Sequence, residues 1–278
     1  MARSVHRSSH IAGCASHGEG RFLGRDGSLM DESPLLEGNL AKQRVQRRLV
    51  ELLSERPDAR ILDLGCVGPQ PLAMWRYVAR EHGSNPRLTG VDVAGIDRAI
   101  ASAKAMQWSG ARFVTASAYE LTRRLPGESF DIVVSTQVLE HIRHIDRYFA
   151  QLAGILAPGG VALLTMDSGH HRRPISTVRR VGKWLAVRAG LERYHEKGVR
   201  DDEVAAAAAR VDLRVVETRH YNINPLKWVH NHGIAAARKD EFAETWYRLE
   251  EIVNDDPAFI ADNKGQFLGV YAELARGV

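Results

Sequence analysis

The stretch "ARILDLGCVGPQP", residues 59 to 71, decides how this sequence folds. Its first half is a short apolar run typical of a buried strand, with Asp63 near the end. Gly65 has no Cβ atom and therefore allows a sharp turn. A helix that begins near Pro71 presents backbone N–H groups without intrahelical partners. The stretch predicts a strand, a turn and a helix whose junction can bind a ligand.

Strand and helix patterns alternate on both sides of this stretch. Residues 39–55 carry apolar side chains at helical spacing, with Asn39 as a candidate N-cap. From residue 59 to residue 167, short apolar runs are separated by helical segments, which predicts a parallel sheet covered on both faces. Two further strands, residues 212–223 and 266–276, are expected to finish the sheet around a long insertion. We therefore predict a doubly wound α/β fold.

The chain divides into an arm and one large domain. Residues 1–33 are rich in Ser, Gly, His and Arg without periodicity, so they are expected to form a flexible arm or a lid. Residues 34–278 form the domain, with insertions at about 168–200 and 220–265 that we expect to build a helical cap. The basic segment Arg172–Arg200 fits either a cap over the site or an amphipathic helix on an anionic membrane surface or on RNA.

Composition narrows the classes of partner. The formal net charge of +4 suits an anionic substrate but is too small for a dedicated nucleic-acid binder, so nucleic acid is an unlikely partner. The two cysteines, Cys14 and Cys66, are too few for a disulfide framework and favour a reducing compartment. The sequence has no apolar run that fits a signal peptide or a transmembrane helix, so we expect a cytoplasmic protein. Composition leaves a homodimer open.

Polar residues collect where the predicted strands end. Because parallel sheets bind ligands at the carboxyl ends of their strands, these residues mark the ligand edge. Asp63 suits a cationic group and would repel a pyrophosphate. A dinucleotide-binding loop needs three glycines, whereas this loop has only Gly65 and Gly68. Asp92 ends the next strand, where a carboxylate accepts the hydroxyls of a ribose. These residues favour a cofactor with an ammonium group and no phosphate.

Four motifs carry a family resemblance. "ILDLGC", "GVDV", "FDIVVSTQVLEHI" and "LAPGGVALLT", in this order between residues 61 and 165, resemble class I S-adenosylmethionine-dependent methyltransferases of the small-molecule group that includes quinone-biosynthesis enzymes. The resemblance implies a Rossmann-like sheet of seven strands, mostly parallel with the last antiparallel. It also implies S-adenosyl-L-methionine as cofactor and S-adenosyl-L-homocysteine as product.

The resemblance assigns cofactor contacts to particular residues. Asp63, Gly65 and Cys66 are expected at the methionine portion, Asp92 at the ribose and Val93 at the adenine. Val67 and Gly68 depart from the family's glycine-rich loop, and Ser117 stands where the family often has an acid for the adenine amine. The other expected cofactor contacts are Ala118, Tyr119, Thr136 and Gln137.

Methyl transfer from a sulfonium is an in-line displacement that depends on alignment in a dry site. A hydroxyl acceptor benefits from a general base, and His141 is the candidate, with packing near the cofactor as the alternative. His144, Asp146 and Asp167 could join nearby histidines as metal ligands, but no compact ligand motif is present, so we expect no metal site. The residues expected to contact a small-molecule acceptor are His170 and His171, which follow a strand, and Tyr221 and Asn222, in a segment that could instead pack as a cap or dimer contact.

Two classes of function remain open. The first is a methyltransferase that acts on an oxygen or nitrogen atom of a small molecule, or on a lipid-linked or RNA acceptor. The second is a non-catalytic Rossmann-like module that binds a nucleoside or a partner protein. Asp63, Gly65 and Asp92 favour the enzyme, whereas Val67 and Pro69 favour the alternative.

Overall fold

A seven-stranded sheet forms the centre of the computed structural model, which describes residues 38–67, 86–105, 108–171 and 198–277, the pairs 22–23 and 29–30, and isolated residues between 74 and 83 and at 181. The strand order is β5-β4-β3-β6-β7-β9-β8. The bounds are β3 Arg60–Leu64, β4 Arg87–Asp92, β5 Ala111–Thr115, β6 Phe130–Thr136, β7 Leu156–Asp167, β8 Leu213–Ile223 and β9 Phe267–Arg276.

Strand β9 runs against the rest of the sheet. The pairs from β5 to β7 are parallel, whereas β9 pairs antiparallel with both β7 and β8. The last strand along the chain is therefore inserted between β7 and β8. The predicted fold class, a mostly parallel doubly wound sheet of seven strands with the last one antiparallel, is confirmed.

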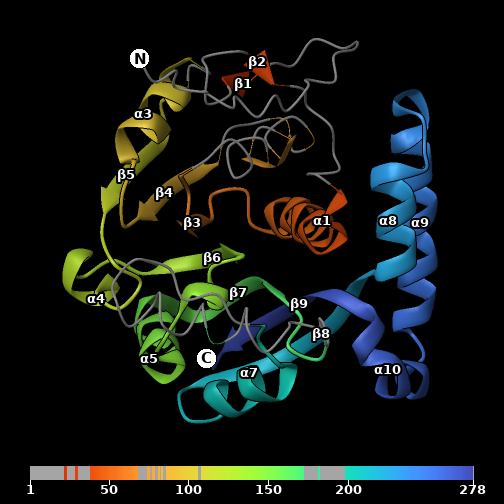
Figure 1. Cartoon of the computed structure of the whole chain (residues 1–278). Helices are drawn as coiled ribbons and strands as arrows, with labels where there is room; N and C mark the ends of the chain where they lie inside the picture. Colours follow the sequence, from red (N-terminus) through yellow and green to blue (C-terminus); the bar gives the residue numbers. More distant parts are fainter. Residues whose placement is uncertain are drawn as a thin grey trace, which may run out of the picture.

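Helices cover both faces of the sheet. In Figure 1, α1 (Leu40–Glu55) lies on one side of it, and α5 (Ile145–Ile155) and α7 (Asp201–Ala208) lie on the other. Because successive side chains of a strand point to opposite faces, Ile61 packs in the cluster with α1 and Leu62 in the cluster with α5. Two apolar cores result, one on each face. Other helices in the described residues before α7 are α3 (Ile96–Ala105), the short α4 (Leu121–Arg124) and η2 (Leu139–His141).

Helix α1 forms where the apolar spacing predicts it. The Asn39 side chain accepts a hydrogen bond from the Lys42 backbone N–H at 3.2 Å, as expected of an N-cap. The buried face contains Leu40, Val45 and Leu49, which pack toward the sheet. This helix contacts β7, β8 and β9, so it fixes the segment around Lys42 beside the second half of the sheet.

Proline decides the local structure at two places, and at the first of them the prediction needs correction. The stretch "LAPGG", residues 156–160, predicts a helix that is stopped by Pro158 and Gly159, but the helix ends earlier, at Ile155, and β7 begins at Leu156. A residue before proline is disfavoured in the helical region, which favours extended backbone here. The polar segment after β8 contains a helix, α8 (Asn224–His232), with its proline in the first turn, where a missing N–H has no cost.

The insertion between β8 and β9 is helical. After α8 it contains η3 (Ala236–Arg238), α9 (Lys239–Asn254), α10 (Pro257–Asn263) and η4 (Lys264–Gln266). Helices α8 and α9 lie side by side at one edge of the molecule (Figure 1). Among the residues that the structure describes, no helix has both the length and the apolar character needed to cross a membrane.

Several expectations fall on other residues. Most of the arm, residues 1–33, lies outside the described residues, apart from an antiparallel pair, β1 (Phe22–Leu23) and β2 (Leu29–Met30). Most of the basic segment 172–200 and of the helix expected after Pro71 is also outside them. Those expectations stay predictions.

Candidate functional site

The carboxyl ends of β3, β4 and β6 meet at the point where the strand order reverses. Strand β3 pairs with β4 on one side and with β6 on the other, so the connections after β3 and β6 leave in opposite directions. Open α/β sheets bind ligands in the crevice outside such a point. Asp63 lies next to the end of β3, while Asp92 and Thr136 are the last residues of β4 and β6. The structure therefore brings these three predicted residues to one edge.

Asp63 is a buried carboxyl group with one unpaired oxygen. Its side chain is 1% exposed, and Oδ2 accepts a hydrogen bond from the Trp75 indole at 2.7 Å. Within the described part of the chain, Oδ1 has no hydrogen-bond partner. Burial raises the pKa of Asp63 to about 7, although the Trp75 hydrogen bond acts in the opposite direction. Such an oxygen is suited to a cationic ligand group, whose charge would favour the ionised carboxylate.

The turn after β3 depends on Gly65. This residue has φ +81°, and a Cβ atom there would lie 2.7 Å from Cγ2 of Val138. The Gly65 N–H donates to the Val91 carbonyl at 2.8 Å, which joins the turn to β4. Cys66 is buried, and burial raises the pKa of its thiol above the usual range. Gly68, the other glycine of the motif, lies outside the described residues.

Asp92 holds the turn from the neighbouring strand. Its Oδ2 accepts from the Val67 N–H at 3.1 Å, and its Oδ1 lies 3.4 Å from the Ala94 N–H. A carboxylate can accept about four hydrogen bonds, so Asp92 retains capacity for ligand hydroxyls. Val93 follows directly and is 60% exposed, which leaves an apolar surface beside the strand end. Val67 therefore holds the loop through its backbone N–H, and its side chain is compatible with this contact.

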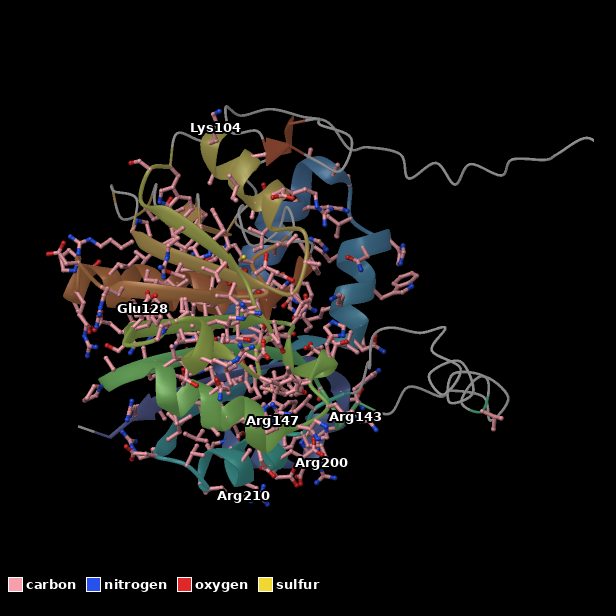
Figure 2. The ribbon with its side chains drawn as sticks, turned by 90° about the vertical axis from the view of Figure 1, so that its left-hand side faces the viewer. Lys104, Glu128, Arg143, Arg147, Arg200 and Arg210 are labelled. Carbon is pink, nitrogen blue, oxygen red and sulfur yellow. The ribbon has the colours of Figure 1, made fainter. Side chains whose placement is uncertain are left out.

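The turn after β5 contains Ser117 and Tyr119, and it contacts the segment that follows η2 along the chain. The Ser117 hydroxyl accepts from the Tyr119 N–H at 3.3 Å, next to Ala118. The Tyr119 hydroxyl accepts from the N–H groups of Arg143 and His144, at 2.8 and 3.0 Å. Arg147 lies over the Tyr119 ring at 5.1 Å, and Figure 2 shows Arg143 and Arg147 on the same side of the molecule. Tyr119 thus positions the chain that follows His141.

Gln137 directs the backbone toward a small cavity. It has φ +54°, an uncommon conformation for a residue with a side chain, and its N–H donates to the Thr165 carbonyl at 2.9 Å and lies 3.2 Å from the Thr165 hydroxyl. The cavity beside it has a volume of about 80 Å³. Its lining is Asn39, Ala41, Gln137, Thr165, Met166, Asp167, Asn222, Lys227, Leu268 and Gly269.

Two charged residues behind this edge escaped the sequence analysis. Glu140 is 4% exposed, its Oε1 accepts from the Asp167 N–H at 2.6 Å, and its buried Oε2 has no partner among the described residues. Burial raises the pKa of Glu140 to about 7. Lys42, also buried, lowers the pKa of both Glu140 and Asp63 through its charge. Their signals in the sequence were an acid in the turn after a strand and a lysine on the apolar face of a helix.

The predicted histidines lie in different surroundings. His141 is exposed on η2, directly after Glu140. His170 and His171 follow β7, and each has a partner from a distant segment: Nε2 of His170 lies 2.6 Å from Oδ1 of Asp201, and Nδ1 of His171 lies 2.9 Å from the Gly265 carbonyl.

Tyr221 and Asn222 differ from the expectation that both contact an acceptor. Tyr221 is fully buried, its hydroxyl donates to Glu251 and its ring stacks on Tyr247, so its side chain belongs to the core. Asn222 lines the cavity, but its side chain accepts from the Leu40 N–H at 3.1 Å and donates to the Gly38 carbonyl at 2.5 Å. It therefore attaches the start of α1 to β8, a link between distant segments that the sequence pattern could not indicate.

Comparison with known proteins gives matches over this same region. A family model described as "Methyltransferase domain" matches residues 39–222. A ubiquinone biosynthesis O-methyltransferase of Brucella ovis is 31% identical over 173 residues, which are 60% of this chain and 64% of the relative. One of Rhizobium etli is 30% identical over 173 residues, with the same coverage. The match therefore spans less than two thirds of the length of these relatives.

Solved structures share the fold at low sequence identity. An S-adenosylmethionine-dependent methyltransferase from Mesorhizobium loti has a TM-score of 0.53 and 19% identity, over 86% of this chain and 100% of the other. The cyclopropane synthase MmaA2 from Mycobacterium tuberculosis has a TM-score of 0.54 and 18% identity, over 84% of each chain. At these identities the likeness concerns the fold alone.

Proposed function

Because this chain belongs to the methyltransferase domain family, we propose that it transfers a methyl group from S-adenosylmethionine to an oxygen atom of a small-molecule acceptor. The observation that carries the proposal is the oxygen of Asp63 that has no partner among the described residues and is buried at the switch point of the sheet, where β4 ends in Asp92. A nucleoside that carries an ammonium group would satisfy both carboxylates. A dinucleotide would instead place its phosphates beside Asp63.

The residues at the end of β3 suit the amino-acid part of this cofactor. When bound, S-adenosylmethionine supplies a methyl group on a positively charged sulfur. Asp63 would hold the ammonium group through Oδ1 while Trp75 keeps Oδ2 in place. The charge of Lys42 already acts on Asp63 and would favour the carboxylate of the same amino acid. Gly65, with no Cβ atom, lets the backbone turn closely there.

The residues at the ends of β4 and β5 suit the nucleoside part. Asp92 has lone pairs left for the two ribose hydroxyls after its contacts with Val67 and Ala94. Val93 would pack its exposed side chain on the adenine. The turn around Ser117 would face the adenine amine. The Ser117 hydroxyl and carbonyl oxygens already accept hydrogen bonds from the N–H groups of Tyr119 and Glu120. Each oxygen has one further lone pair that can accept from the adenine amine.

The cavity beside Gln137 is the proposed entrance of the acceptor. It lies at the ends of β6 and β7, and its lining contains amide, carboxyl, hydroxyl and ammonium groups. These groups can bind an acceptor with several polar substituents, such as a catechol or another phenol. The name of the Brucella ovis relative, an O-methyltransferase, supports oxygen over nitrogen.

A phenolic acceptor must lose its proton as the oxygen attacks. Two neighbours are candidate bases. His141 has an imidazole suited to this step at neutral pH. Glu140 has a pKa raised to about 7 by burial and an unpaired oxygen. We propose His141 as the base and Glu140 as the group that positions the Asp167 backbone. With His141→Gln, kcat should fall by about 100-fold and its pH dependence should disappear. Glu140→Gln should keep the pH profile of the unaltered enzyme, and the opposite pattern would assign the base to Glu140.

Binding and transfer are tested in sequence. Titration calorimetry with S-adenosylhomocysteine should give one site per chain, which Asp92→Ala removes. Tritiated S-adenosylmethionine is then supplied with a panel of catechols, phenols, primary amines and small RNA. Label in the phenolic products supports the proposal, and label only in amines or RNA overturns the acceptor class. Binding without transfer to any member would support the non-catalytic nucleoside-binding module, whereas no binding at millimolar S-adenosylhomocysteine would reject the methyltransferase.

A further inference from the structure

Three potential ligand atoms meet beyond the end of β7. They come from His170 in the segment after β7, Asp201 in the first turn of α7 and His220 within β8. One ligand atom from each lies within 4.8 Å of the others. We propose that His170, Asp201 and His220 bind a divalent transition-metal ion, with zinc as the best fit.

His220 is the independent sign of a ligand. Its side chain is 3% exposed, and neither ring nitrogen has a hydrogen-bond partner among the described residues. The Nε2 atom lies 3.5 Å from Oδ2 of Asp201, too far for a good hydrogen bond. The ring packs against the His170 ring and the edge of Phe267, with centroids 6.3 and 5.9 Å apart. A buried imidazole whose nearest polar partner in the described part of the chain is 3.5 Å away can accept a closer ligand atom, and a metal ion supplies one.

The spacing of the three groups agrees with tetrahedral coordination. Two ligands at 2.0–2.1 Å from a tetrahedral zinc ion lie about 3.3 Å apart. Nε2 of His170 lies 2.6 Å from Oδ1 of Asp201, and Nε2 of His220 lies 3.5 Å from Oδ2 of the same carboxylate. These spacings are close to the tetrahedral value, and metal binding would lengthen the shorter one by roughly 0.7 Å. With its proton on Nδ1, His170 offers the Nε2 lone pair to the ion. Two histidines and one carboxylate, with a fourth position open, form a ligand set typical of zinc.

Lys264 forms an ion pair with the carboxylate that would bind the ion. Its ammonium lies 2.5 Å from Oδ2 of Asp201 and balances the carboxylate charge. A divalent ion and this ammonium would repel each other, so metal binding must displace the lysine. The Lys264 side chain is 32% exposed and ends in a flexible stem, so it can turn into solvent. We therefore expect the removal of this charge to strengthen metal binding.

An ion at this position would connect three segments that lie far apart in the sequence. The segment with His170 is joined to the cavity wall because the Ser168 N–H donates to the Leu268 carbonyl at 2.9 Å, and Leu268 lines the cavity. Ser168 also forms a parallel bridge with Val199, just before α7. Metal binding should therefore stiffen this wall and raise the melting temperature of the protein.

The test uses the full chain freed of metal by a chelator. Zinc affinity is measured by competition with a chromophoric chelator, and Co²⁺ is used for visible absorption typical of tetrahedral nitrogen and oxygen ligands. His220→Gln and His170→Gln should each weaken zinc binding on the order of 100-fold. Lys264→Met should strengthen it about tenfold, because no ammonium remains to be displaced. His171→Gln is the matched control, since its imidazole contacts the Gly265 carbonyl, and it should leave the zinc affinity unchanged.

Two results would overturn the proposal. The first is zinc binding that persists unchanged in His220→Gln, which would place the ion elsewhere on the chain. The second is Lys264→Met with no gain in affinity for zinc or cobalt, which would show that the lysine and the ion do not compete. The lysine variant leaves both imidazoles and the carboxylate in place, so it decides the matter even if the histidine variants fail to fold.

Discussion

The substitution Asp63→Asn removes a charge from the proposed ammonium contact and changes little else in size. In the structure Oδ2 of Asp63 accepts from the Trp75 indole at 2.7 Å, and Oδ1 is unpaired in the described part of the chain. An asparagine that keeps the Trp75 bond through its oxygen turns its NH₂ group toward the ligand position. That group would meet the cofactor ammonium as a second donor.

The expected loss follows from the energy of one charged hydrogen bond. Such a bond contributes about 1.5–3 kcal/mol, so Asp63→Asn should weaken S-adenosylhomocysteine binding by roughly 10- to 150-fold. The pH dependence gives a second signature. Burial raises the pKa of Asp63 to about 7, and only the ionised form can hold the ammonium. In the unaltered protein, affinity should therefore rise with pH, and at pH 6 it should be about tenfold below its plateau.

Calorimetry at several pH values between about 5.5 and 8.5 measures both effects. The affinity of Asp63→Asn should not vary with pH in this range through this group. Trp75→Phe, which removes the donor that lowers the pKa of Asp63, should move the rise in affinity to higher pH. Asp131→Asn is the control, because this aspartate accepts from the Arg60 N–H at the opposite end of β3. A pH-independent affinity in the unaltered protein, or an Asp63→Asn variant that binds as tightly as the unaltered protein, would refute the reasoning.

Three further predictions concern stability. Gly65→Ala should lower the free energy of unfolding by about 1–3 kcal/mol, because φ is +81° and the new Cβ atom would meet Val138. Gly127→Ala is the control, because φ is +70° there but no atom lies within 4 Å of the new Cβ atom. In the same urea titration this variant should lose less stability. Glu250→Ala removes the acceptor of the Asn222 and Ile223 N–H groups and of the Trp246 indole. Urea titration should therefore show a free energy of unfolding that is lower by about 3 kcal/mol or more, and a decrease below about 1 kcal/mol would contradict this. Burial raises the pKa values of Asp63, Glu140 and Glu250 to about 7. Ion pairs lower the pKa values of Asp201 and Glu217, but this contribution is complete by about pH 5.5. Between about pH 5.5 and 7 the folded state therefore binds more protons than the unfolded state, so the free energy of unfolding should fall as pH rises through that range. Glu250→Gln should reduce the slope, and a stability that rises toward pH 7 would count against this prediction.

The sequence predicts the sheet well because each strand is decided by its own residues. The apolar runs before Asp63, Asp92 and Asp167 are long enough for strands and too short for helices, so their order and their ends follow directly. The resemblance to class I methyltransferases carried by the same motifs is confirmed by the family match over residues 39–222. The exact end of a helix was harder to predict, as at the helix that ends at Ile155, before Pro158 and Gly159.

The parts of the site that escaped prediction depend on pairings between distant segments. Lys42 stands on the apolar face of α1, and only the packing of that helix brings its charge near Asp63 and Glu140. Asn222 has a sequence neighbourhood that is polar and aromatic, yet its partners are Gly38 and Leu40. A single sequence contains no signal for such contacts, since residue spacing reports only on neighbours along the chain.

The placement of β9 also sets an order of events in folding. Strands β7 and β8 have no pairing with each other, and each is hydrogen bonded to β9, so the half of the sheet beyond β6 closes only after residues 267–276 have been synthesised. Until then β7 presents a bare edge, and nascent chains with open edges are prone to pair with one another. The slow step of folding should thus be the docking of one strand, and a chain cut before residue 267 should aggregate rather than fold.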